Sequence, residues 1–328
     1  MDKSRQTIEE TINIPSAVIE VRKSRNLVLD ILIRLVKEKP LGTVGAIIVL
    51  LLIFTGIFAN FLAPYEYTDQ SLFDRLQPSS AEHLLGTDNL GRDVLSRIIF
   101  GARISMYVCL AGSAICAVSG TVIGLVSGFF GGKTDIIIQR FVDAFMCFPP
   151  IFLYLMVMSL LGQGLWQVVL VLGLIRGIHQ SRIIRGAVIS IKGNIYVDAA
   201  NAIGCSNLRM IYRHILPNVM APIITVTVVS SGYMILGEAM LSFLGFGLPP
   251  DQPSWGTMLA GAGRTYLLKA PWLALWPGLA LSVTVYGLNM LGDAIRDLLD
   301  PRLRGGLGRY SGVKRKRAKK YRQEGEET

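Results

Sequence analysis

The sequence predicts an all-α membrane protein with six transmembrane helices. Only 17% of the 328 residues are charged and 51% are hydrophobic, a balance that excludes an ordinary soluble enzyme. Long uncharged stretches recur along the chain, and roughly 20 apolar helical residues cross a bilayer core about 30 Å thick. Basic residues concentrate in alternate segments between these stretches, as expected for a chain that crosses a membrane repeatedly.

The uncharged stretches define the expected helices. Residues 144–175 lack charge over about 48 Å of helix at 1.5 Å per residue, which exceeds one crossing, and Gly162-Gln163-Gly164 interrupts them. We therefore expect two helices joined by that turn, the second running past Arg176 to Ser181, with the arginine reaching for the nearer membrane surface. The complete expected set is 41–62, 104–132, the two helices within 144–181, 215–237 and 270–292.

The charge distribution predicts that both termini are cytoplasmic. Of the 33 lysines and arginines, 27 lie in the segments assigned to the inside and six lie outside. The extracytoplasmic loop, residues 63–103, has four arginines against six acidic residues. The inner segments are 1–40, 131–140, 176–215 and 293–328, so a five-helix core spans 104–293 and a basic cytoplasmic tail spans 294–328.

The tail carries a basic run, Lys314–Arg317, which is compatible with nucleic acid or with anionic lipid. No aromatic platform or nucleic-acid motif accompanies the run. Each basic residue beside a span contributes about 1 kcal/mol of binding free energy to an anionic lipid surface. We expect membrane lipid, and no nucleic acid, to be its partner. The stretch 1–25 is also polar and is expected to be poorly ordered.

No motif in the sequence indicates catalysis or metal binding. The four cysteines form no zinc spacing and the three histidines are scattered. Residues 127–134 (SGFFGGKT) nearly match the phosphate-loop pattern GxxxxGK[ST], but the first glycine is missing and an apolar helix precedes the segment instead of a strand. We expect a glycine turn there, with no catalytic residue, metal or cofactor on this chain.

The inner segment 182–217 is patterned as two short helices. Residues 196–204 (YVDAANAIG) place Asp198 in the first turn of the first helix, where a negative charge favours the helix dipole. Residues 208–214 form the second helix and lead to Pro217, which starts the next span at a position that needs no backbone donor. Small residues leave a face that another protein can approach closely: Ala199, Ala200 and Gly204. A helix lying on the lipid surface is the alternative.

This segment resembles a known motif. The run YVDAANAIGCSNLRMIYRHILPN is similar to the EAA loop of ABC importer permeases, whose pattern is E-A-A, three residues, G, nine residues and I-x-L-P. Two positions depart from the pattern, since Asp198 replaces the usual glutamate and His214 occupies the isoleucine position. The residues in register are Asp198, Ala199, Ala200, Gly204, Leu216 and Pro217.

Three further stretches narrow the family. They are LLGTDNLGRDVLSRIIFGARISM from Leu84, LSFLGFGLPPDQPSWGTML from Leu241 and LGDAIRDLLDPRLR from Leu291. All resemble the C-type permease of the dipeptide, oligopeptide and nickel ABC importers. The similarity extends from about Leu41 to Arg304.

The resemblance implies a type I permease fold and a multi-pass protein of the plasma or inner membrane. The six residues in register would form a coupling helix that docks on a separate ATPase, with Asp198 either capping the helix or pairing with an ATPase arginine. Arg182 and Arg185 resemble the family's ARxxR and would anchor the loop at lipid headgroups. ATP and Mg²⁺ would belong to two ATPase subunits, which, with a second homologous permease and an extracytoplasmic substrate-binding protein, would complete the transporter.

The expected translocation pathway is lined by polar residues in the last two spans. Ionisable groups within a span are functional candidates by default. Glu238 lies about 21 residues beyond Pro217 and so near the outer surface, where a structural hydrogen bond or salt bridge is an equal alternative. The candidates are Ser230, Ser231, Tyr233, Glu238 and Asn289.

Two other classes of membrane protein are weighed against the importer. A secondary transporter should show inverted internal repeats, and none is evident here. A scaffold or channel needs no coupling helix. Peptides are the expected cargo, with nickel or another small solute as the alternative.

Overall fold

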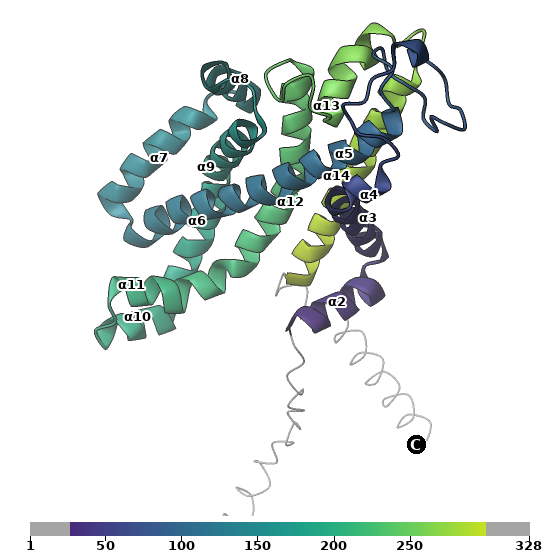
Figure 1. The fold of residues 1–328 in the computed structure, drawn as a ribbon. Helices are drawn as coiled ribbons and strands as arrows, with labels where there is room; N and C mark the ends of the chain where they lie inside the picture. The colour runs from purple at the N-terminus through teal and green to yellow at the C-terminus, as the bar shows by residue number, and fades with distance from the viewer. Residues whose placement is uncertain (1–26, 300–328) are drawn as a thin grey trace, which may run out of the picture.

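The computed structural model describes residues 27–299, and this range is helical apart from its connecting segments (Figure 1). Within it, β pairing is limited to one isolated bridge between Thr87 and Asp93. The all-α prediction is therefore confirmed for the described part of the chain. The polar stretch 1–25 and the tail from residue 300 onward lie outside the described residues.

The helices follow one another along the chain with short connections. The elements are α2 (Leu27–Glu38), α3 (Pro40–Ile57), α4 (Ala59–Leu62), η1 (Leu72–Asp74), α5 (Val94–Tyr107), η2 (Val108–Gly112), α6 (Ser113–Phe130), α7 (Gly132–Met146), α8 (Pro150–Leu161), α9 (Leu165–Lys192), α10 (Ile195–Ala202), α11 (Asn207–Arg209), η3 (Met210–Ile215), α12 (Leu216–Phe243), α13 (Trp255–Met258), η4 (Leu259–Gly263) and α14 (Trp272–Leu299).

Four helical runs within residues 27–299 are long and apolar enough to cross a membrane: Pro40–Ile57, Val94–Phe130, Asn207–Phe243 and Trp272–Leu299. The pair α7 and α8 passes the same test together and would be a fifth span, bent by 89° at its break. Helix α9 has 28 residues but is not among these runs, since Arg176 and Arg182 dilute its apolar character. The count of six therefore stays a prediction.

Several helix ends differ from the expected ones. The second span begins at Val94 instead of Ile104, because the Asp93 side chain caps the helix by accepting the Ser96 backbone N–H at 2.7 Å. Residues 131–140, expected as a loop, are almost entirely helical in α7.

The expected helix from Ala144 is broken, because the consecutive prolines Pro149 and Pro150 cannot continue α7 and instead start α8. The turn at Gly162-Gln163-Gly164 joins α8 to α9, as the sequence predicts.

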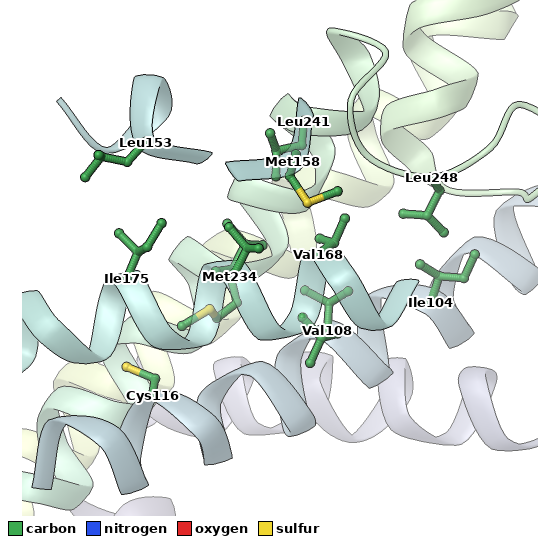
Figure 2. Close-up of a cluster of buried hydrophobic side chains, with 13 residues drawn as sticks. Ile104, Val108, Cys116, Leu153, Met158, Val168, Ile175, Met234, Leu241 and Leu248 are labelled. Carbon is green, nitrogen blue, oxygen red and sulfur yellow. The ribbon is translucent and has the colours of Figure 1, made fainter. Parts of the chain in front are cut away.

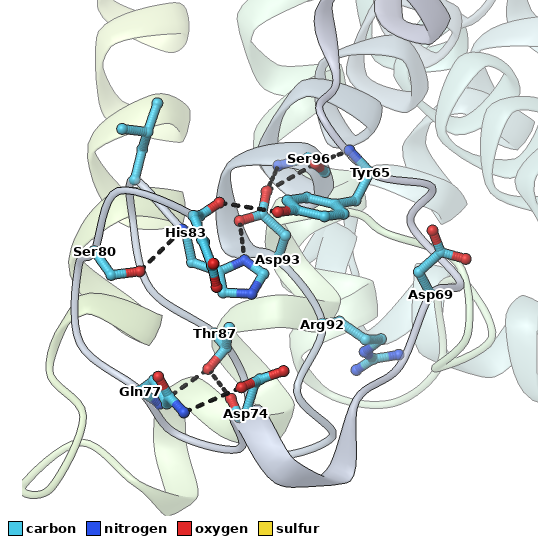
Figure 3. A network of polar contacts seen from close by, with 12 residues as sticks. Tyr65, Asp69, Asp74, Gln77, Ser80, His83, Thr87, Arg92, Asp93 and Ser96 are labelled. Atoms are coloured by element: carbon cyan, nitrogen blue, oxygen red, sulfur yellow. Dashed lines mark hydrogen bonds and ion pairs between the residues drawn. The ribbon is translucent and has the colours of Figure 1, made fainter.

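The segment between α4 and α5 is fixed by polar contacts (Figure 3). The buried Asp93 carboxylate bonds with His83 Nδ1 at 3.1 Å and accepts the Ser96 hydroxyl at 2.7 Å. The buried Thr87 hydroxyl donates to the Asp74 carbonyl and accepts the backbone N–H of Gln77. These side chains give a segment without long helices a defined structure.

Helices α6 and α9 approach each other closely. A Cβ atom added at Gly124 of α6 would lie 2.8 Å from Ile184 Cβ and from the Ser181 carbonyl oxygen of α9. Glycine at this position lets the two backbones pack in contact, as small residues do between membrane helices. The main apolar cluster then extends from this pair to α5, η2, α8 and α12, and Figure 2 shows Val108, Val168 and Met234 at its centre.

The two ends of the helical assembly differ. Figure 1 places α2, α10 and α11 at one end, and the segment 63–93 with α13 at the other. Helices α10 and α11 therefore lie at the same end as α2, as the predicted topology requires. Lys39, just after α2, forms an ion pair with Asp297 of α14 at 2.5 Å and ties the two elements together.

Candidate coupling surface and transmembrane cavity

The segment after α9 folds into two short helices, as the sequence predicts. Helix α10 ends in a turn at Gly204, whose φ of 81° is in the left-handed region that favours glycine. The second helix, α11 with η3, continues into α12 without a break, and Pro217 lies in the first turn of α12. Leu216 and Pro217 therefore lie at the junction with the span and not on α10.

One side of α10 packs on the rest of the chain. Val197 and Ala200, three residues apart and so on one helix face, are 1% and 7% exposed and belong to a cluster with Met210 and Ile215. The expectation that Ala200 faces a partner protein therefore differs from the structure. Its neighbour Ala199 is exposed.

Asp198 is exposed, and its carboxylate makes no hydrogen bond or ion pair with the residues between 27 and 299. The N-cap position belongs to Asn194, four residues earlier, whose carbonyl accepts the Asp198 backbone N–H at 3.4 Å. The structure thus does not show the expected capping role of Asp198. The side chain is free to meet a partner.

The exposed side of α10 and α11 carries large apolar side chains that sequence reasoning missed. Ile195 and Ile203 are each 86% exposed, and Leu208 and Tyr212 are 69% and 67% exposed. Ile195, Ala199 and Ile203 are spaced four residues apart and so follow one stripe. This four-residue spacing is the feature of the sequence from which the exposed stripe could have been predicted. We refer to Ile195, Ala199, Ile203, Leu208 and Tyr212 as the α10–α11 apolar surface.

A cavity of about 500 Å³ opens beside this surface, between α10 and η3. Ile203 and Gly204 form part of its wall, Arg209 and Arg213 supply its charge, and His214 also lines it. An apolar surface beside a basic cavity suits a protein partner that carries acidic residues. Gly204 has open space around it, since a Cβ there would meet nothing within 4 Å.

A second cavity of about 580 Å³ lies between α9, α12 and α14. Of the predicted pathway residues, Ser230 lines it. Tyr233 is 53% exposed and stacks on the guanidinium of Arg176, and Asn289 is exposed on α14 beside Gly232. Arg176 therefore stacks against protein instead of reaching only for the membrane surface.

Ser231 and Glu238 do not line this cavity. The Ser231 hydroxyl is buried against Ser113 of α6 at 2.8 Å. Glu238 is fully buried, and its Oε1 accepts the Ser242 hydroxyl at 2.7 Å, while Oε2 has no hydrogen-bond partner among the described residues. The structural alternative for Glu238 therefore fits its position better than the pathway role.

Residues 127–134 join α6 to α7 by a turn with Gly131 at φ 66°, and the Ser127 hydroxyl bonds to Asp135. The segment connects two helices and does not follow a strand, so the expected glycine turn is observed.

Apolar spans, a helix pair with an exposed apolar surface and a cavity between three long helices are the features expected of a membrane-embedded transport subunit. Residues 120–305 match the family described as binding-protein-dependent transport system inner membrane component, and residues 29–78 match the N-terminal TM domain of oligopeptide transport permease C. The chain belongs to this family of ABC importer permeases.

Curated relatives support the assignment. The dipeptide transport system permease protein DppC of Alkalihalophilus pseudofirmus is 38% identical over 82% of this chain and 88% of the relative. The oligopeptide transport system permease protein OppC of Bacillus subtilis is 36% identical over 86% of this chain and 92% of the relative. The di/tripeptide transport system permease protein DppC of Pseudomonas aeruginosa is 38% identical over 79% of this chain and 88% of the relative.

A solved structure shares the fold. The inward-facing MetNI methionine ABC transporter contains a chain that matches with a TM-score of 0.53 at 15% identity, covering 62% of this chain and 96% of that one.

Proposed function

We propose that this chain is one of two permease subunits of an ABC importer that carries peptides across the cell membrane. The main support for this proposal is the similarity to di-, tri- and oligopeptide permeases, at 36–38% identity over 79–86% of the chain. These relatives favour peptides over the nickel alternative. A companion permease, two ATPase subunits that bind ATP and Mg²⁺, and an extracytoplasmic binding protein complete the transporter.

The α10–α11 apolar surface is the proposed docking site for an ATPase subunit. Apolar side chains exposed at 67–86% outside the spans indicate a protein contact. Because α11, η3 and α12 form one continuous run, a displacement of the docked surface passes directly to α12, which lines the transmembrane cavity. ATP-driven closure of the ATPase pair would thus switch the cavity between inward-facing and outward-facing states.

ATP drives this switch only by the difference in its affinity for the two states, so it must favour one of them by a few kcal/mol. The docking role requires α10 to lie in the cytoplasm. The N-terminal helix lies at the same end, which supports a cytoplasmic N-terminus.

Copurification and uptake test the proposal. Tagged chain solubilised in mild detergent should retain two ATPase subunits and a second permease, which neither a channel nor a secondary transporter requires. Cells should take up radiolabelled di- and oligopeptides but not nickel when the chain is present, and a strain without it is the control. Recovery of the chain without ATPase partners, or uptake of nickel alone, would overturn the proposal.

A further inference from the structure

Arg176 lies beside the middle of α12, which belongs to one of the candidate spans. It lies 11 residues after the start of the 28-residue helix α9, and Ser230 lies 14 residues after the start of the equally long α12. A guanidinium at such depth is costly unless it pairs with an anion or faces a polar cavity, and it therefore marks a functional position.

The groups that hold this guanidinium are neutral. Its Cζ lies 4.2 Å from the centre of the Tyr233 ring, and its Nε donates to Ser230 Oγ at 3.4 Å. A guanidinium carries five N–H donors, and no carboxylate among residues 27–299 forms an ion pair with Arg176. Most of its hydrogen-bonding capacity is left for a ligand.

A buried layer behind the arginine fixes these contacts. The Ser230 hydroxyl donates to Gln180 Oε1 at 3.2 Å, and the Gln180 amide donates to Thr227 at 3.2 Å. Because the only hydroxyl hydrogen of Ser230 goes to Gln180, its oxygen is left to accept from Arg176. Ser230 and Gln180 are 3% and 4% exposed. The arginine is thus oriented before any ligand arrives.

Among residues 27–299, the charged side chains that line this cavity are basic. They are Arg176 and Arg296, and no aspartate or glutamate of this range is in the lining. The cavity extends from Ala221 and Leu299, at one end of α12 and α14, to Ser230 at mid-depth. A volume of about 580 Å³ lies within the range that accommodates a small ligand.

We propose that Arg176 binds the C-terminal carboxylate of a peptide in this cavity, so that the permease itself favours peptides with a free α-carboxylate. The planar guanidinium matches a carboxylate bidentately, and the low-dielectric surroundings strengthen that contact. The basic cavity repels the ammonium group at the other end of the peptide, which sets the direction in which the peptide lies. This inference rests on the proposed peptide transport.

The complete transporter in proteoliposomes, with its binding protein, tests the inference. The probes are radiolabelled alanylphenylalanine and its C-terminal amide, each at a concentration shown by titration to saturate the isolated binding protein. Wild type should import the acid about tenfold faster than the amide, the factor expected for one charge-assisted hydrogen bond. Arg176→Gln should bring the two rates within about twofold by slowing the acid.

Two further variants keep the test decisive. Arg176→Lys retains the charge without the planar guanidinium and should show an intermediate preference for the acid over the amide. If Arg176→Gln fails to assemble, this variant tests the inference in its place. Arg140→Gln removes an arginine whose side chain is 79% exposed, and it should keep the wild-type preference.

The failure modes are distinct. An unchanged preference in Arg176→Gln overturns the inference, and so does an equal loss of both rates, which would mean that Arg176 pairs with a carboxylate of the companion permease. Import of neither peptide by wild type would instead overturn the proposed function.

Discussion

Arg185 of α9 forms a bidentate ion pair with Asp135 in the first turn of α7, with Nε donating to Oδ1 at 2.6 Å and the second nitrogen donating to Oδ2. A parallel pair, Arg182 with Asp143, joins the same two helices. The resemblance implies that both arginines lie at lipid headgroups, which stays a prediction, and the structure shows that both also pair with α7. Since Val142 is the one buried residue of α7, these pairs are its main attachment to α9.

Breaking the Arg185 pair should therefore loosen α7. Arg185→Gln removes a charge-assisted bidentate contact that is partly buried, and we expect a loss of about 1 to 3 kcal/mol in stability. Thermal unfolding of the purified transporter in detergent measures it. The double variant Arg185→Asp with Asp135→Arg should recover most of the loss. Equal instability of the single and double variants would contradict the pairing.

Bulk added to the exposed face of α10 should uncouple transport. Ala199→Trp places a large side chain on the proposed docking surface without disturbing the buried side of the helix, so the protein should fold but import peptides at least about tenfold more slowly. Asn201 is exposed and lies about 200° around the helix from Ala199, so Asn201→Trp is the matched control. Similar uptake by both variants would count against docking at this face.

Gly204→Trp should also abolish uptake while leaving assembly or ATPase activity partly intact. The left-handed φ of 81° strains any side chain, so Gly204→Ala is needed as the control that carries strain without bulk. We expect the alanine variant to keep most of the transport, since open space surrounds the position. Comparable loss in both variants would assign the effect to strain at the turn.

The sequence predicted those features that depend on apolar length and local turn chemistry. The turn at residues 162–164 and the two short helices after α9 depend on glycines and on residue spacing. Both act through contacts between residues that are close in the sequence. The break at Pro149 was missed because proline is uncharged, so a search for uncharged stretches does not detect prolines within them. The early start of α5 was missed because residues 94–103 contain two arginines, and the fold accommodates both: Arg97 is buried, and Arg103 donates to the Gly56 carbonyl.

The site depended on tertiary contacts that spacing alone does not encode. Ala199 and Ala200 are equivalent in the sequence pattern, yet only packing on Met210 and Ile215 decides which one faces outward. In the same way, Ser230 and Ser231 are neighbours on one helix, and the relative rotation of α12 directs one to the cavity and the other to α6.

The close approach of α6 and α9 predicts intolerance to a larger residue at Gly124. Valine there would overlap Ile184 and the Ser181 carbonyl, so the helices must separate, at a cost of about 1 to 3 kcal/mol. Gly186 of α9 has no atom within 4 Å of an added Cβ, and Gly186→Ala should be neutral or stabilise by about 0.5 to 1 kcal/mol. Thermal unfolding distinguishes the two, and equal effects would contradict the packing.

Glu238 is expected to serve the fold and not the transport step. Its side chain is fully buried beside Ser242 with Oε2 unpartnered among the described residues. Methionine is similar in length but leaves the buried Ser242 hydroxyl without its acceptor, so the change should cost about 1 to 3 kcal/mol. Glu238→Ala leaves a cavity and should cost about 2 to 5 kcal/mol. Because the residue lies outside the transmembrane cavity, peptide uptake per folded Glu238→Met molecule should stay within about twofold of wild type. A stable methionine variant that no longer imports peptide would instead place the carboxylate in the transport cycle.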